Sequence, residues 1–371
     1  MFFFKCGRSY KSPSVSAALA STNPHRTKTM KTKLILAAAI LVTCSFLVQA
    51  GEPIPIASVT GPVGIVVATN NNHVYVLDSV PYQFYTYGSV KIFDGATNAF
   101  IRSFATGQFS HGITFDGYHN KVYVAGGDDA VWIINSNTDQ LVVDQFNNPK
   151  KIKIPSGSSL ASIAFSYYST YTYVTYFDGS LSKNSPAVGI IDGATDSVIG
   201  SIYGFDGTLT GITWPLHFAA HLMYALRGGA PGKVYSIDAF TRTITKATTV
   251  ENSSPFPFEA FVSMGSENSR TLTYVANSNS NTLSVIAADG SVVATIPVPS
   301  RPVAVAGEVE FAAGGGHVWV ACKDAGTVVE IEEHRITRTW TGFNKPTALL
   351  FNRRDNKLYV GCAGQLYVIH L

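Results

Sequence analysis

The chain is poor in charge, and this shortage excludes some classes of protein. Charged residues make up only 14% of its 371 residues, whereas it has 18 tyrosines, 22 phenylalanines and 32 glycines. This balance argues against a disordered chain or a coiled coil and favours a β-rich globule with many tight turns. The length alone allows one large domain or two to three ordinary ones.

The sequence also lacks the common reactive motifs. It has no G-x-S-x-G, H-E-x-x-H, C-x-x-C or C-x-x-C-H motif and no Walker glycine loop. The glycine-rich segment AGGGH, 313–317, reads as a hairpin turn because no helix follows it to bind phosphate. The segment 178–187 lacks the spacing of a calcium loop. We therefore expect no metal and no cofactor, and we expect a protein that is not an enzyme.

No apolar run is long enough for a transmembrane helix. The stretch from Leu34 to Val48 is shorter than the roughly 20 residues required. Two lysines precede it and Val48-Gln49-Ala50 follows, which is the layout of a signal peptide over 30–50. Residues 1–29 would then be an upstream extension from a misassigned start. The alternatives are a true N-terminal anchor or acylation at Cys44. We expect a periplasmic or secreted protein.

Without the N-terminal segment the chain has no excess of basic residues. Residues 1–50 contain seven of the 27 Lys and Arg and none of the 24 Asp and Glu, so residues 51–371 carry a net charge of −4. A nucleic-acid-binding surface needs clustered surplus Lys and Arg. We expect no nucleic-acid partner.

A tyrosine or tryptophan between apolar residues recurs along the chain, and it defines a repeat. The spacings run from 40 to 51 residues, a period typical of propeller blades. The recurring aromatic residues are Tyr75, Tyr123, Tyr173, Tyr224, Tyr274, Trp319 and Tyr359.

Each repeat contains further strand-like runs around that aromatic residue. A short apolar run precedes it (GITF, GITW), a third run follows (VGIID, VYSID), and turns such as DGATN lead to a fourth (VIGSI). Each unit is therefore a four-stranded antiparallel blade, and residues 51–371 are predicted to form a single all-β domain, a seven-bladed β-propeller.

The segment LTYVANSNSNTLSVIAADGSVVATIPVPSRPVAV, Leu272–Val305, resembles the YVTN-type β-propeller repeat. The likeness covers residues from about 54 to 371, and the third and fourth units depart most from it. The resemblance implies the same propeller fold.

The last unit has three strands, and the start of the chain supplies a surplus one. We expect Ile54–Val59 to pair with Gln365–Ile369, because a closed ring hides strand edges that would otherwise template aggregation. The alternative is an open solenoid. Cys322 and Cys362 occupy equivalent places in neighbouring blades, so they should point the same way. We expect buried thiols rather than a disulfide.

Loops that enter first strands and loops that join second to third strands meet on one face of a propeller, where function usually resides. The candidate ligand-binding residues on these loops are Tyr82, Tyr85, Tyr87, His111, Asp128, Asp178, Arg227, Glu259, Arg301, Lys323 and Lys345.

Three features of this face carry specific hypotheses, each with a simpler alternative. The aromatic loop Asp78–Ser89 is either a binding surface or a loop folded back on its own blade. His111 is a base or ligand, or a hydrogen-bonded histidine at the channel mouth. Four cations form a funnel for an anionic ligand, or they are solvated charges partnered by Asp324 and Glu259. The four are Arg227, Arg301, Lys323 and Lys345.

The leading hypothesis is a monomeric, exported propeller that binds a protein, a peptide or a cell-envelope ligand at this face. The alternative rests on a resemblance to lactonases of the phosphogluconolactonase type. It implies a hydrolase in the central funnel with His111, Glu259 and Arg301 as catalytic residues.

Overall fold

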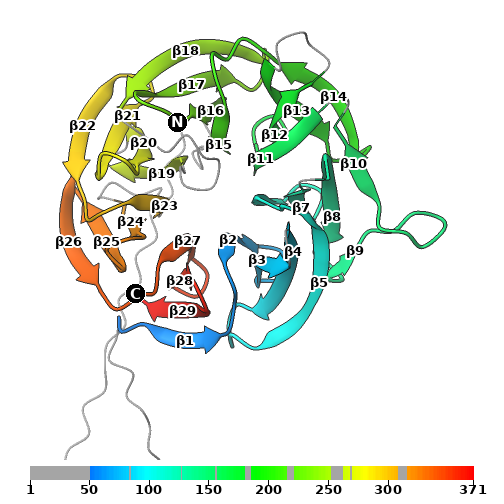
Figure 1. Ribbon diagram of the computed structural model, residues 1–371, viewed down its shortest axis with the longest axis horizontal. Coiled ribbons are helices and arrows are strands. Elements are labelled where there is room, and N and C mark those ends of the chain that lie inside the picture. The colour runs from blue at the N-terminus through cyan, green and yellow to red at the C-terminus, as the bar shows by residue number, and fades with distance from the viewer. Residues whose placement is uncertain are drawn as a thin grey trace, which may run out of the picture. The chain divides into compact units, whose positions relative to one another are not determined.

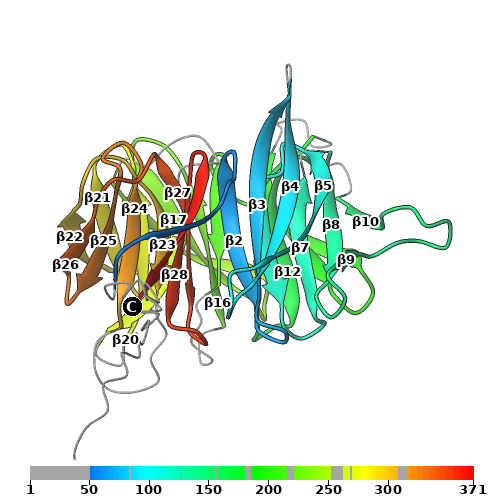
Figure 2. The ribbon, with the colours of Figure 1, turned by 90° about the horizontal axis from the view of Figure 1, so that it is seen from below.

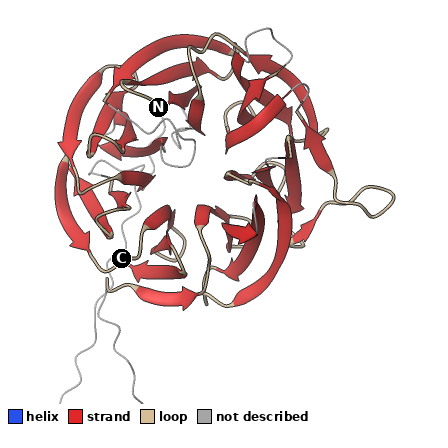
Figure 3. Ribbon diagram, viewed as in Figure 1, coloured by secondary structure: helices blue, strands red, loops and turns tan. Residues whose placement is uncertain are grey.

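A computed structural model describes residues 51–82, 85–126, 128–154, 157–179, 185–214, 221–251, 262–267, 270–307 and 316–371. Within these residues the secondary structure consists of strands and turns (Figure 3). The predictions for residues 1–29 and 30–50 fall outside the described part. No described helix is long and apolar enough to cross a membrane.

The described strands form seven antiparallel sheets, as the repeat predicts. The innermost strands are β2 (Pro62–Ala68), β6 (Gly112–Asp116), β11 (Gly157–Phe165), β15 (Leu209–Thr213), β19 (Val262–Glu267), β23 (Pro302–Gly307) and β27 (Pro346–Asn352). The second strands are β3 (His73–Tyr82), β7 (Lys121–Gly126), β12 (Tyr171–Asp178), β16 (Leu222–Arg227), β20 (Arg270–Asn277), β24 (Val318–Cys322) and β28 (Lys357–Cys362).

The outer half of each blade completes the meander. The third strands are β4 (Tyr85–Asp94), β8 (Ala130–Asn135), β13 (Ser185–Asp192), β17 (Gly232–Asp238), β21 (Thr282–Ala287), β25 (Thr327–Glu332) and β29 (Gln365–His370). The outermost strands are β5 (Phe100–Gln108), β9 (Gln140–Leu141) with β10 (Lys151–Lys153), β14 (Ser197–Ile202), β18 (Thr243–Val250), β22 (Val292–Pro297), β26 (Arg335–Trp340) and β1 (Ile54–Ala57).

The blades follow one another around a closed ring (Figure 1). Each inner strand lies beside the inner strands of both neighbouring blades, and β27 of the last blade lies beside β2 of the first. β1 pairs with β29 in antiparallel register, Ile54 opposite Val368 and Ala57 opposite Leu366. The predicted closure by the start of the chain is therefore confirmed, and the edge of β29 is covered.

The hydrophobic core is divided among the seven blade interfaces. Each buried cluster combines residues of two adjacent blades, as where Trp319 of the sixth blade packs with Leu349 and Val360 of the seventh. Strands buried on both faces explain why the sequence shows near-continuous apolar runs instead of strict alternation. The inner strands also approach closely, because a Cβ on Gly112 would lie 3.0 Å from the backbone nitrogen of Ile163.

Both described cysteines are buried free thiols, as expected. Cys322 packs in the interface of the fifth and sixth blades, whereas Cys362 packs in the interface of the sixth and seventh. They therefore lie on opposite sides of the sixth blade. Burial raises the pKa of each thiol to about 12.

The recurring tyrosine links each of several blades to the next. The hydroxyl of Tyr173 donates to the carbonyl of Ala239 at 3.0 Å, and that of Tyr359 donates to Asn98 Oδ1 at 2.9 Å. Tyr75 donates in the same way to Asp139 of the following blade, and Tyr123 to Asp196. In each case the acceptor lies in the turn between the third and fourth strands of that following blade. We call this contact the interblade latch.

The residue two positions before the tyrosine reinforces the latch in three blades. His73 Nδ1 lies 2.8 Å from Asp139 Oδ2. Lys121 donates to Asp196 Oδ1 at 2.7 Å, and Lys357 donates to the carbonyl of Gly95 at 2.7 Å. The repeat thus encodes contacts between blades as well as strands within them.

The interblade latch predicts that Tyr173→Phe lowers the free energy of unfolding by about 1–2 kcal/mol, because the Ala239 carbonyl loses a buried hydrogen bond. Equilibrium unfolding in urea measures this change. Tyr118→Phe is the matched control, since Tyr118 is 69% exposed. Equal midpoints for Tyr173→Phe and the wild type would contradict the prediction.

Candidate functional site

The ring encloses a central cavity with a volume of about 710 Å³. Its wall is built from the inner strands β2, β6, β11, β15, β23 and β27 and is mainly apolar, with residues such as Ile65, Ile113 and Ile163. Ligand pockets typically have a volume in this range. Their walls are mainly apolar and carry a few polar groups, as this one does. The two mouths of the cavity supply most of the polar groups.

His111 lies at the mouth on the side where chains enter the first strands. It directly precedes β6, its backbone nitrogen donates to the carbonyl of Ala125 at 3.1 Å, and its ring lies 6.5 Å from that of Phe109. Burial lowers the pKa of His111 to about 4. The imidazole is therefore neutral at neutral pH and can accept or donate a hydrogen bond to a ligand in the cavity.

The opposite mouth combines aromatic, amide and cationic side chains. The rings of Tyr167 and Trp214 lie 5.5 Å apart beside the cavity. Asn352 donates to Asn72 at 3.0 Å, and Asn72 donates to Asp355 at 2.7 Å, so the amides of the first and seventh blades are tied together. The exposed Arg354 also lines this mouth. These residues belong to or follow the ends of inner strands.

Three predicted polar residues on the loop face form bonds within their own blades. Asp128 pairs with Lys151 at 2.8 Å, and the buried Asp178 accepts a hydrogen bond from Tyr203 at 2.8 Å. Arg227 Nε donates to Asp206 at 2.9 Å. None of these three is among the described residues that line the cavity.

The other predicted cations also lie away from the cavity wall. Arg301 lies 3.6 Å from Asp324, the partner that the simpler alternative expected. The backbone nitrogen of Lys323 donates to the Arg301 carbonyl at 2.8 Å. Lys345 is exposed. Glu259 lies outside the described residues. Among the described candidates, His111 is the one that lines the cavity.

The aromatic segment Asp78–Ser89 is a continuation of two strands, where the sequence suggested a loop. Its residues stay in register, with Asp78 opposite Ser89 and Tyr82 opposite Tyr85. β3 and β4 consequently project beyond the neighbouring strands (Figure 2). Tyr87 is 37% exposed, and its hydroxyl accepts a hydrogen bond from Gln108. The side chains of Tyr82 and Tyr85 lie outside the described part.

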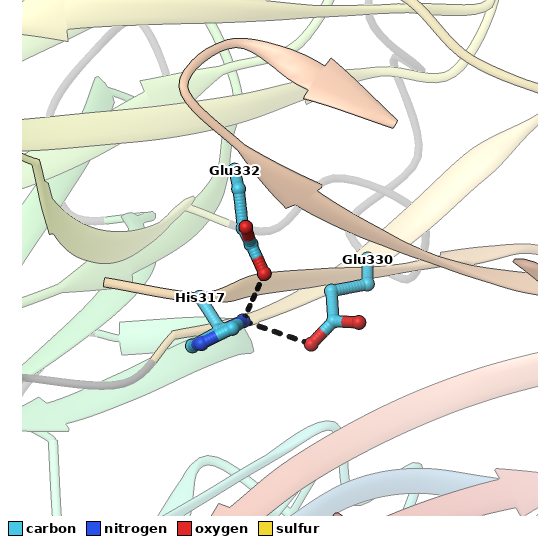
Figure 4. Close-up of side chains that lie close together, drawn as sticks. All are labelled: His317, Glu330 and Glu332. Carbon is cyan, nitrogen blue, oxygen red and sulfur yellow. Dashed lines mark ion pairs between the residues drawn. The ribbon is translucent and has the colours of Figure 1, made fainter. Parts of the chain in front are cut away.

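Sequence reasoning missed two groups of residues. The first is the second mouth of the cavity, because its residues follow the inner strands on the face opposite the candidate loops. The second is a cluster of His317, Glu330 and Glu332 in the sixth blade, whose ligand atoms lie within 4.8 Å of one another (Figure 4). The spacing of two glutamates by two residues in a strand was the available signal, since such residues share a face.

Fold and cavity together define the class of this protein as a seven-bladed β-propeller. No protein-family model and no curated protein matches the chain. Among solved structures, hydrazine synthase of Kuenenia stuttgartiensis matches with a TM-score of 0.66 and 13% identity, covering 84% of this chain and 96% of that chain. At this identity the likeness shows the fold alone. Membership in the YVTN-type family stays a prediction.

The lowered pKa of His111 predicts an acid-sensitive contribution to stability. The pKa is about 4 in the folded protein and 6.5 without burial, so the unfolded chain takes up the proton first. The contribution is complete above pH 6.5 and falls by up to about 3 kcal/mol between pH 6.5 and 4. His111→Gln should flatten the decline of unfolding free energy over this window. Phe240→Ala, at an exposed residue without a titratable group, should leave the decline unchanged. A His111→Gln profile equal to that of the wild type would contradict the assignment.

Proposed function

We propose that the protein is an exported, monomeric binding scaffold that holds a protein, a peptide or a cell-envelope ligand at the face bearing the β3–β4 hairpin. The projection of this hairpin beyond the ring is the observation that carries the proposal (Figure 2). Strands β3 and β4 each have ten residues, whereas the neighbouring β7 and β8 have six.

The composition of the hairpin favours recognition over a purely structural role. Tyrosines provide rigid contact area with a polar group at the end, and binding surfaces are enriched in them. Tyr82, Tyr85 and Tyr87 lie within six residues of one another. The ring below them is fixed by seven packed interfaces, so the hairpin is presented on a rigid support.

Export and family membership are part of the proposal. Cleavage after Ala50 would leave Gly51 as the first residue. Gly51 is buried, and its carbonyl accepts a hydrogen bond from the Trp340 indole. A mature chain that starts at this residue would keep the contact with Trp340 of the sixth blade, and the YVTN-like segment at Leu272–Val305 is consistent with such a protein.

The hairpin proposal predicts that a shortened variant loses its partner. Replacing residues 80–87 by Asn-Gly joins Ser79 to Gly88, which are opposite each other in the ladder, and Asn-Gly suits a two-residue hairpin turn. Cross-linking followed by mass spectrometry, with protein expressed in the native host, should show the partner with the wild type and lose it with the shortened variant.

Phe240→Ala provides the matched control for this experiment. Phe240 is 76% exposed and lies in the turn between β17 and β18, on the opposite face of the ring. It should keep the wild-type partner. Identical cross-links for the shortened variant and the wild type would contradict a binding role for the hairpin.

A lactonase-like hydrolase is the second candidate, and the position of His111 beside the cavity favours it. A neutral imidazole could accept a proton from water that attacks a lactone. The lowered pKa of His111 makes it a weak base, and Arg301 lies close to Asp324, so the binding role has more support.

The hydrolase candidate predicts that purified protein hydrolyses sugar lactones and that His111→Ala reduces kcat/KM by about 100-fold or more, the usual contribution of a general base. A pH-stat assay measures the acid released. Phe240→Ala, at an exposed residue outside the cavity lining, serves as control and should keep the wild-type rate. Equal rates for wild type and His111→Ala would dismiss a catalytic role for His111.

A further inference from the structure

The cluster in the sixth blade arises from strand register. β24 pairs with β25 so that Val318 lies opposite Ile331 and Trp319 opposite Glu330. Continuing this register by one residue places His317 opposite Glu332. Glu330 and Glu332 are two residues apart in one strand and share a face. All three side chains therefore converge at the end of the β24–β25 ladder (Figure 4).

His317 occupies the latch position of its blade, two residues before Trp319. Its counterparts His73, Lys121 and Lys357 bond to the turn between the third and fourth strands of the following blade. The following blade here is the seventh, whose third and fourth strands, β29 and β1, come from opposite ends of the chain. No such turn connects them. His317 instead contacts the acidic residues of its own blade.

Two carboxylates meet a single nitrogen atom in this cluster. His317 Nδ1 lies 2.9 Å from Glu330 Oε1 and 2.8 Å from Glu332 Oε1. Nδ1 is buried, and neither oxygen completes a hydrogen bond with it. An imidazole nitrogen carries at most one proton in one in-plane direction, so it cannot satisfy both carboxylates. A cation placed between the three atoms can satisfy all of them.

Two arginines lie opposite the two glutamates in the neighbouring strand. Arg338 and Arg335 of β26 are the register partners of Glu330 and Glu332. Among the described residues, however, no ion pair joins either arginine to these carboxylates. The guanidinium of Arg338 lies over the Trp340 ring, 4.6 Å from its centroid. With a neutral imidazole the three side chains carry two negative charges.

We propose that His317, Glu330 and Glu332 form a binding site for a divalent transition-metal ion of the Zn²⁺ class. One imidazole nitrogen and two carboxylate oxygens suit Zn²⁺ better than Mg²⁺ or Ca²⁺, which prefer oxygen ligands alone. Tetrahedral bonds of about 2.1 Å separate ligand atoms by about 3.4 Å, which small side-chain rotations can reach. The exposed fractions are 37% for His317, 12% for Glu330 and 39% for Glu332. A fourth ligand can therefore enter from solvent.

Calorimetric titration of Zn²⁺ into protein treated with a chelator and then dialysed tests the site. The wild type should bind one Zn²⁺ ion per chain with a dissociation constant in the micromolar range or tighter. Glu330→Gln and Glu332→Gln keep the side-chain shape, and each should weaken binding by more than about 100-fold, because even partners outside the ligand set contribute 10–100-fold. His317→Ala should do the same, and circular dichroism checks that each variant is folded.

A fluorescence measurement locates the bound ion. The ring of His317 stacks on that of Trp319 with centroids 5.8 Å apart, so Co²⁺ bound at the site should quench Trp319. Trp319→Phe should abolish this quenching while Zn²⁺ still binds.

His221→Ala is the matched control for both measurements, because His221 faces a single carboxylate, that of Asp238 at 3.5 Å. This variant should bind Zn²⁺ as the wild type does. Absence of Zn²⁺ binding to the wild type, or equal affinities for the wild type and both glutamine variants, would overturn the proposal.

Discussion

The pairing of β1 with β29 is the constraint on which the rest of the structure depends. A propeller has no single core, because its apolar residues are divided among the interfaces between adjacent blades. Each interface is complete only when every blade has a neighbour on both sides. The antiparallel pairing of Ile54 with Val368 joins the two ends of the chain, and it covers the edge of β29. Closure therefore sets the geometry of every blade and of the cavity between them.

The same closure makes the sixth blade different from its neighbours. In the first, second, third and seventh blades a tyrosine bonds to a turn of the following blade, and in three of these a lysine or histidine two residues earlier contacts the same turn. The seventh blade has no such turn, because its outer strand comes from the start of the chain. In the sixth blade Trp319 takes the place of the tyrosine, and it packs with Phe351 of the seventh blade. His317 is left to contact Glu330 and Glu332. The proposed metal site is thus a local consequence of how the ring is closed.

The polar groups of the cavity lie apart from its apolar wall. The inner strands give the cavity an apolar wall, and the polar side chains gather at its two mouths and on the loops. Several charged residues that could have focused an anionic ligand have partners nearby instead: Arg227 with Asp206, and Arg301 with Asp324. The projecting hairpin and the cavity mouths are parts of the described surface that could contact a ligand without breaking the contacts that hold the blades together.

The sequence by itself determined the number of blades, their strand order, the closure by Ile54–Val59 and the separation of Cys322 from Cys362. These features depend on local periodicity and on repeat position, which can be read along the chain. Only the tertiary structure decided which side chains meet. His111 reaches the cavity although Arg301 does not, and His317 joins Glu330 and Glu332, because such contacts depend on strand register, on ring closure and on the competing partners within each blade. Those are properties of the assembled ring, and a single segment does not contain them.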